Sequence, residues 1–184
     1  MTATENKVRF GLKNFHYAVR NGNTPGTPVH VPGSVSLDLQ PQGEQSKFYA
    51  ENIAYYVTQS NQGYSGDLVI AYVPDAMRQA VWGEVLQETD KVLYEVANAE
   101  PAVVDIGFQI DGDQQERLTW VYGCTISRPA LGSNTIGETK EVQPQTLTIT
   151  SSPLANGLVK SVTTKDTTAA VRSAWFESVY VPTI

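Results

Sequence analysis

Residues 102–126 read AVVDIGFQIDGDQQERLTWVYGCTI, and this stretch decides the fold class. Apolar residues alternate with other residues on both sides of Asp111-Gly112-Asp113, which is a turn signal. The pattern predicts a β-hairpin. We expect both strands to contribute to one buried face, made of Ala102, Val104, Ile106, Phe108 and Ile110 before the turn and Leu118, Trp120, Tyr122, Cys124 and Ile126 after it.

The opposite face of the first strand is more polar. Antiparallel sheets commonly bury one face and leave the other in water. We therefore expect this face to meet solvent or a water-filled space. Its residues are Val103, Asp105, Gly107, Gln109 and Asp111.

Segments on either side of the hairpin show the same period of two. In residues 8–19 the alternation changes parity near Lys13 and Asn14, which predicts a strand with a bulge. Further strands are expected at 29–39, with an interruption at Pro32-Gly33, and at 64–72, 145–151 and 176–181.

Two segments have features of helices. The segment 74–86, PDAMRQAVWGEVL, opens with proline and aspartate, which suit a first helical turn. Its apolar stripe consists of Met77, Val81 and Val85. A second, short helix is expected at 167–175, capped by Thr167 or Thr168. The residues alone thus predict one mainly β domain with one or two helices.

Residues 40–62 are the least suited to a core, because most of them are polar. Loops of more than ~12–15 residues are uncommon in compact domains unless they are functional. Two interpretations stay open: an extended arm that docks on a partner, or a hairpin folded back on its own sheet. The aromatic residues expected to make inter-subunit contacts are Phe48, Tyr49, Tyr55 and Tyr56.

Composition limits the possible functions. The 184 residues include 13 Lys and Arg against 19 Asp and Glu, a net charge of −6, which argues against a protein that clamps nucleic acid. An acidic balance is compatible with a conduit past which a polyanion slides. No stretch reaches the ~18 apolar residues of a membrane span, so we expect no contact with a membrane.

No constellation for catalysis, cofactor binding or metal binding is apparent. His16 and His30 are the only histidines, and Cys124 is the only cysteine and lies on an apolar strand face. The segment 132–139 has the glycine spacing of a phosphate-binding loop, but Glu138 stands where a lysine is needed. We therefore predict that the protein is not an enzyme and needs no cofactor or metal.

Eight separated motifs are spread over nearly the whole chain. They are KVRFGLKNFHYA (7–18), PGSVSLDL (32–39), FYAENIAYYV (48–57), NQGYSGDLVIAYVPD (61–75), RP (128–129), TLTITSSP (146–153), GLVK (157–160) and AWFESVYVP (174–182). Through these motifs the chain resembles the major tail protein, or tail tube protein, of siphophages that infect Gram-positive bacteria. The resemblance is weaker at 86–102 and 131–142.

The resemblance implies a single tail tube domain over residues 1–184, with 40–62 as the arm. Its fold would be a β-sandwich or barrel with one flanking α-helix and a second short helix. Since the sequence given ends at Ile184, we expect no C-terminal immunoglobulin-like domain. Six copies would form a ring, and rings would stack into the tube that delivers the genome into the host.

The same resemblance implies particular partners and a location. The partners would be other copies of the chain, a tape-measure protein, tail-tip and tail-terminator proteins, and double-stranded DNA in passage without sequence-specific binding. The location would be the virion tail, assembled in the host cytoplasm. Because inward-facing cations would hold DNA back, we expect the bore to be lined by Asp67, Asp105 and Gln109. The alternative is that these strand faces point outward or against a neighbouring subunit. A carbohydrate-binding β-sandwich module of a phage or bacterial surface protein, using Trp82, Trp120 or Trp175, remains the alternative.

Overall fold

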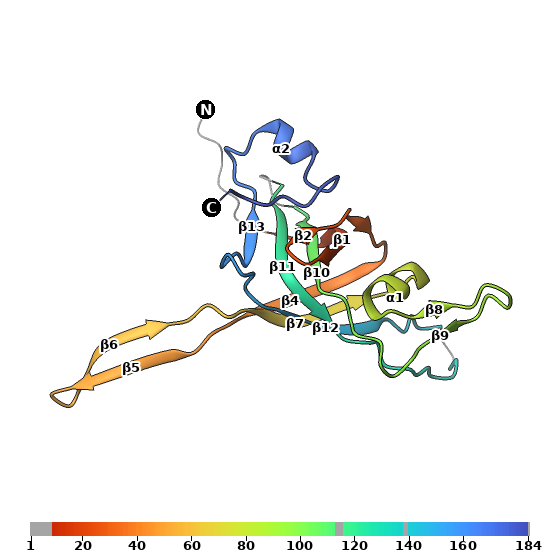
Figure 1. The fold of residues 1–184 in the computed structure, drawn as a ribbon, viewed down its shortest axis with the longest axis horizontal. Coiled ribbons are helices and arrows are strands. Elements are labelled where there is room, and N and C mark those ends of the chain that lie inside the picture. Colours follow the sequence, from red (N-terminus) through yellow and green to blue (C-terminus); the bar gives the residue numbers. More distant parts are fainter. Residues whose placement is uncertain (1–8, 113–115, 138–139, 184) are drawn as a thin grey trace.

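The computed structural model describes residues 9–112, 116–137 and 140–183, and these form a mainly β fold with two short helices. The expected fold class is confirmed at that level. The described residues include a nine-stranded antiparallel sheet with the order β2-β1-β10-β11-β12-β7-β4. Two shorter strands add to this path, β3 beside β1 and β13 beside β11. Figure 1 shows the sheet curving through the body of the molecule.

The strands of the main sheet come from both halves of the chain. From the first half come β1 (Leu12–Asn21), β2 (Thr24–Pro25), β3 (Val29–His30), β4 (Ser34–Gln42) and β7 (Gly63–Ile70). From the second half come β10 (Val104–Ile110), β11 (Leu118–Ile126), β12 (Gln145–Ser151) and β13 (Lys160–Val162). The predicted bulge near Lys13 is confirmed, as is the strand at 145–151.

One face of the sheet is buried in the larger of two core clusters. The apolar positions of six strands meet there with helix α1 (Asp75–Trp82). Fully buried members include Phe15, Leu68, Ile70, Ile106, Leu147 and Ile149. Trp82 closes the contact between helix and sheet, because its indole N–H donates a hydrogen bond to the Ile126 carbonyl at 2.8 Å.

The other face of the β10–β11 hairpin is also covered, by the C-terminal segment that contains α2 (Ala169–Ser173). Trp120 and Tyr122 pack there with Trp175. The Trp120 indole N–H donates to the Trp175 carbonyl at 3.0 Å. Gly107 has no side chain, which leaves room for the Trp120 ring. The hairpin is thus covered on both faces, unlike the half-solvated sheet expected from its sequence.

The expectation that ten apolar residues of this hairpin share one face is wrong. A bulge adds one residue to β11 between Val121 and Cys124. Gly123 adopts a φ of +60° there, a conformation that suits glycine. The extra residue reverses the alternation, so Cys124 lies in the larger cluster while Trp120 lies in the smaller one.

Two other expected elements end differently. Helix α1 ends at Trp82, so Met77 and Val81 are buried as predicted, but Val85 lies beyond the helix and is exposed. The predicted closing strand at 176–181 does not form. This segment instead packs on the smaller cluster, and the Tyr122 hydroxyl donates to the Tyr180 carbonyl. Thr168 caps α2, as expected.

Candidate functional site

The arm is a β-ribbon that extends away from the body (Figure 1). Strands β5 (Gln45–Ala50) and β6 (Ile53–Gln59) form a separate two-stranded sheet and pair with no other strand of the described residues. Backbone hydrogen bonds continue the β4–β7 ladder into the ribbon, from Gln62 N–H to the Gln42 carbonyl and from Ser60 N–H to the Glu44 carbonyl. The arm is therefore a hairpin, but it is not folded back on its own sheet.

Nearly every residue of the ribbon is exposed, including its large apolar side chains. The four predicted contact residues expose 61–74% of their surface, and none of them belongs to either core cluster. Ile53 and Val57 are two further exposed apolar residues that sequence reasoning did not select. Their position in the same FYAENIAYYV run was the available signal.

A second candidate surface is the outward face of strands β4, β7 and β12. The register places Asp67 between Asp38 and Thr148, with all three side chains on one face, and the Thr148 hydroxyl donates to Asp67 at 2.9 Å. Three neighbouring sets of paired residues cross β4, β7 and β12 on this face, and none of their nine residues is a lysine or arginine. These positions are Ser36, Asp38, Gln40, Ser65, Asp67, Val69, Thr146, Thr148 and Thr150.

The structure places the three expected bore residues in different environments. Asp67 is exposed on this polar face. Asp105 and Gln109 are buried in the subunit, with 0% and 7% exposure, so the prediction that they face a bore is wrong. The physical reason is the C-terminal segment, which covers the side of β10 that alternation alone assigned to water.

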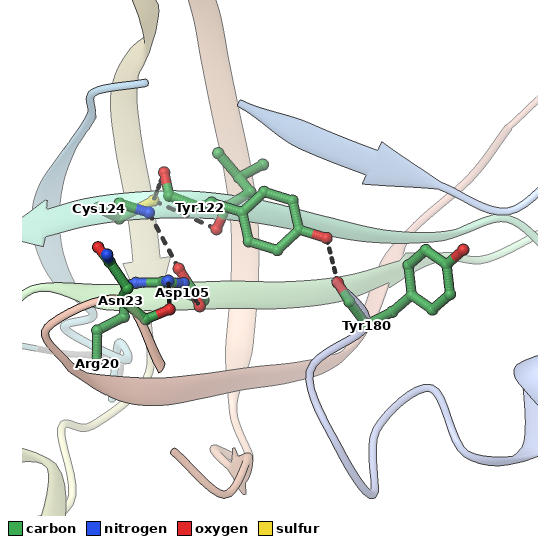
Figure 2. A network of polar contacts seen from close by, with 8 residues as sticks. Arg20, Asn23, Asp105, Tyr122, Cys124 and Tyr180 are labelled. Atoms are coloured by element: carbon green, nitrogen blue, oxygen red, sulfur yellow. Dashed lines mark hydrogen bonds and ion pairs between the residues drawn. The ribbon is translucent and has the colours of Figure 1, made fainter. Parts of the chain in front are cut away.

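Asp105 instead stabilises the fold within a buried polar network (Figure 2). One carboxylate oxygen accepts the Gly123 amide at 3.0 Å, and the other accepts a guanidinium N–H of Arg20 at 2.5 Å. Arg20 also donates to the Asn23 carbonyl at 2.6 Å. Burial raises the pKa of Asp105, and the Gly123 amide and Arg20 oppose that shift. The network holds the β11 bulge against β1 and β10.

Gln109 is also used inside the subunit. Its side-chain carbonyl accepts a hydrogen bond from the Asn14 amide group at 2.8 Å. Asn14 lies at the β1 bulge and has a φ of +53°. Gln109 therefore fixes the bulge of the neighbouring strand.

A third exposed apolar surface lies on the small hairpin of β8 (Val85–Leu86) and β9 (Leu93–Tyr94). Val85 pairs with Tyr94 and shares its face, and both are more than two fifths exposed, as is Val92. This hairpin lies near α1, at the end of the molecule opposite the arm (Figure 1). Sequence reasoning missed it because its two-residue strands show no readable alternation.

The residues examined as candidates for catalysis or metal binding pack against other side chains of the fold. Cys124 is fully buried, and burial raises the pKa of its thiol. The His16 ring stacks on Phe176 with centroids 4.4 Å apart and lies 4.9 Å from the His30 ring. Within 9–112, 116–137 and 140–183, no three His, Cys, Asp or Glu side chains are grouped to hold a metal. Glu138, which decided against a phosphate-binding loop, lies outside these ranges.

A carbohydrate-binding platform usually needs an exposed aromatic face, for which tryptophan is well suited. Trp82, Trp120 and Trp175 expose 0–2% of their surface, so the three tryptophans considered for the carbohydrate-binding alternative form no such platform. Among the described residues, the arm holds four exposed aromatic side chains in one short segment, whereas Phe10, Tyr72, Tyr94 and Tyr180 are exposed at separate places in the chain. In the part of the chain that the structure describes, no helix is long and apolar enough to span a membrane.

Comparison with known proteins adds no relative to these observations. No protein-family model and no curated protein matches the chain. The features that bear on function are therefore the sequence motifs and three surfaces: the arm, the polar face of β4, β7 and β12, and the β8–β9 hairpin.

Proposed function

We propose that the chain is a structural virion protein, a tail tube subunit that forms rings of six which stack into the conduit for phage DNA. The observation that carries this proposal is the arm, whose four aromatic side chains are 61–74% exposed among the described residues of their own subunit. A ribbon with such a surface fits a protein that completes its packing only by assembly. The motifs that resemble tail tube proteins supply the rest of the proposal.

The positions of the apolar surfaces favour an open assembly over a closed dimer. The arm and the β8–β9 hairpin lie at opposite ends of the longest axis (Figure 1). Contacts between two different surfaces are heterologous, and they generate rings or filaments. We propose the β8–β9 hairpin, with Val85, Val92 and Tyr94, as one surface that receives a neighbouring copy.

The polar face of β4, β7 and β12 is the proposed lining of the bore. Asp38 lies directly opposite Asp67, an arrangement of like charges that costs stability in a sheet. A bore that must not hold DNA gives a functional reason for that arrangement. Replacing both with lysine should permit tube assembly but slow DNA ejection, and added salt should relieve the defect. Normal ejection at low salt would contradict this lining.

The partners and location follow from the same proposal. Other copies of the chain, a tape-measure protein, and tail-tip and terminator proteins would contact the tube in the virion tail. Double-stranded DNA would pass through without sequence-specific binding, which agrees with the net charge of −6.

An arm deletion tests the proposal directly. Removing residues 44–60 leaves Gly43 and Asn61 as a two-residue turn between Gln42 and Gln62, which are already joined by a backbone hydrogen bond. We expect this variant to stay folded by circular dichroism and thermal unfolding. Full-length protein should form rings or tubes under negative-stain microscopy, alone or on a tail-tip initiator, and the deletion variant should form neither.

The control is a full-length variant with polar changes in the arm, Gln45→Ser with Gln59→Ser, which should assemble normally. Full-length protein that stays monomeric at high concentration and on the initiator would overturn the tube proposal. Tubes formed by the deletion variant would remove the arm from the interface and leave the tube itself standing. An unfolded deletion variant would place the arm in the internal core.

A further inference from the structure

The strand register of the arm puts large apolar side chains on both of its faces. Phe48 is paired with Tyr56, so these two rings share one face, and Ile53 lies on the same face through its pairing with Ala50. Tyr49 is one residue along from Phe48 and points to the opposite face. Lys47 and Val57 are paired on that second face.

A bulge gives the ribbon a further aromatic residue. The register shifts between the Phe48–Tyr56 pair and the Tyr49–Ala54 pair, and this leaves Tyr55 without a partner residue on β5. Tyr55 is 74% exposed, the highest value among the arm's aromatic residues. Both faces of the ribbon therefore carry large apolar side chains, unlike a surface that stays in contact with water.

The exposed area is large for such a narrow element. An aromatic side chain offers ~150–250 Å² of surface, so the four rings together expose roughly 500 Å². A standard protein interface buries ~800 Å² per partner. Since an isolated two-stranded hairpin is only marginally stable in water, the ribbon gains most if both of its faces are covered.

We propose that the arm is a wedge, seated between two other copies of the chain so that each copy covers one face. This inference rests on the proposed tube, whose repeated subunits supply two neighbouring surfaces. A ribbon lying on a single flat surface would bury Phe48 and Tyr56 and leave Tyr49 and Val57 in water, or the reverse.

The arm's charge argues against a membrane or a nucleic acid as the occupant, because either would require several cations on the arm. Residues 44–60 contain one cation, Lys47, and two acidic residues at the ends of the strands, Glu44 and Glu51. The remainder of the chain has a net charge of −5, so another copy offers acidic residues with which Lys47 can pair, and the arm's own net charge of −1 adds little repulsion.

Photocrosslinking from each face tests the wedge. A benzophenone amino acid replaces Phe48 in one variant and Tyr49 in another, and crosslinked peptides from assembled tubes are identified by mass spectrometry. We expect both positions to give products between copies, mapping to two different surfaces. The same variants, diluted until they are monomeric, are the control and should give no product between copies.

Crosslinks from both positions that map to one surface would overturn the wedge, as would the absence of crosslinks from one of the two positions. Either result would leave the tube proposal unaffected. Failure of the unmodified protein to form rings or tubes would overturn both.

Paired substitutions provide an independent measurement. Phe48→Ser with Tyr56→Ser removes rings from one face, and Tyr49→Ser with Val57→Ser removes apolar surface from the other. Each pair should raise the concentration needed for assembly by roughly 10-fold or more, as expected for the loss of buried interface anchors. Gln45→Ser with Gln59→Ser should change it by less than about twofold. If only one of the two pairs raises the concentration needed for assembly, the wedge is contradicted.

Discussion

The hairpins β10–β11 and β5–β6 have similar local construction and opposite surroundings. Both consist of antiparallel strands rich in aromatic and β-branched residues. In β10–β11 the large side chains are buried on both faces, by one core cluster on each side. In β5–β6 the large side chains of both faces are exposed.

The difference teaches that apolar content does not assign a strand to the core of its own chain. β10–β11 is buried because α1 and the C-terminal segment are available to cover it. Among the described residues no helix or strand covers the arm, which continues from β4 and β7 beyond the end of the main sheet (Figure 1). Burial of the arm's apolar side chains can therefore stabilise a complex with a partner instead of the arm's own subunit.

The largest expected effect is on the stability of the buried hairpin. Trp120→Ala removes a fully buried ring and its hydrogen bond to the Trp175 carbonyl. The free energy of unfolding should fall by about 3–5 kcal/mol, as measured by urea denaturation. A loss below about 1 kcal/mol would mean that the second core cluster is poorly packed. The β10–β11 hairpin would then not differ from the arm in how much its side chains stabilise the subunit.

The next effect separates the two acidic residues that sequence reasoning grouped together. Asp105→Asn keeps an acceptor for the Gly123 amide but leaves the buried Arg20 without its counter-charge. Its free energy of unfolding should fall by about 2–3 kcal/mol, whereas the matched change Asp67→Asn should stay within about 0.5 kcal/mol. Equal losses in urea denaturation would mean that the two carboxylates do not differ in environment.

A smaller effect is the dependence of stability on pH through His16, whose ring stacks on Phe176 in the C-terminal segment that covers β10–β11. Burial is the main cause of the lowered pKa of His16, and nearby His30 lowers it further. The unfolded chain therefore binds a proton more readily than the folded chain. The stability due to neutral His16 should be present above the usual histidine pKa of ~6.5 and be lost as pH falls below it.

His16→Gln checks this expectation. Between pH 7.5 and pH 5, the variant should lose less stability in urea denaturation than the unmodified protein. An equal loss in both proteins would assign the acid sensitivity to other groups.

The smallest expected change in stability is in the arm. Phe48→Ala should alter the free energy of unfolding of the monomer by no more than about 0.5 kcal/mol, because the ring contacts no core cluster. Urea denaturation of dilute protein measures this value beside that of Trp120→Ala. A loss above about 2 kcal/mol would show that the arm packs on its own subunit in solution.

Local patterns were sufficient for much of the fold. The strand at 145–151, the bulge near Lys13 and the buried positions Met77 and Val81 could all be predicted from alternation, parity and helical spacing. The closing strand at 176–181 could not, because Phe176 and Val179 pack as an irregular cover in the cluster of Trp120 and Tyr122. Periodicity does not distinguish a strand from such a cover.

Of the candidate site, the sequence identified the aromatic cluster at 48–56 and one polar position, Asp67. It could not separate Asp67 from Asp105, since both are acidic residues that alternate with apolar neighbours. Their environments differ because the C-terminal segment covers one strand and leaves the other open.

The sequence by itself determined a mainly β chain, its principal hairpin and an acidic composition, because these depend on residue type and spacing over a few neighbours. Only the tertiary structure decided which faces are buried. Burial depends on elements distant in sequence, such as the Trp175 segment over Trp120. The bulge at Gly123, which moves Cys124 to the opposite core, likewise depends on its contact with Asp105, eighteen positions earlier in the chain.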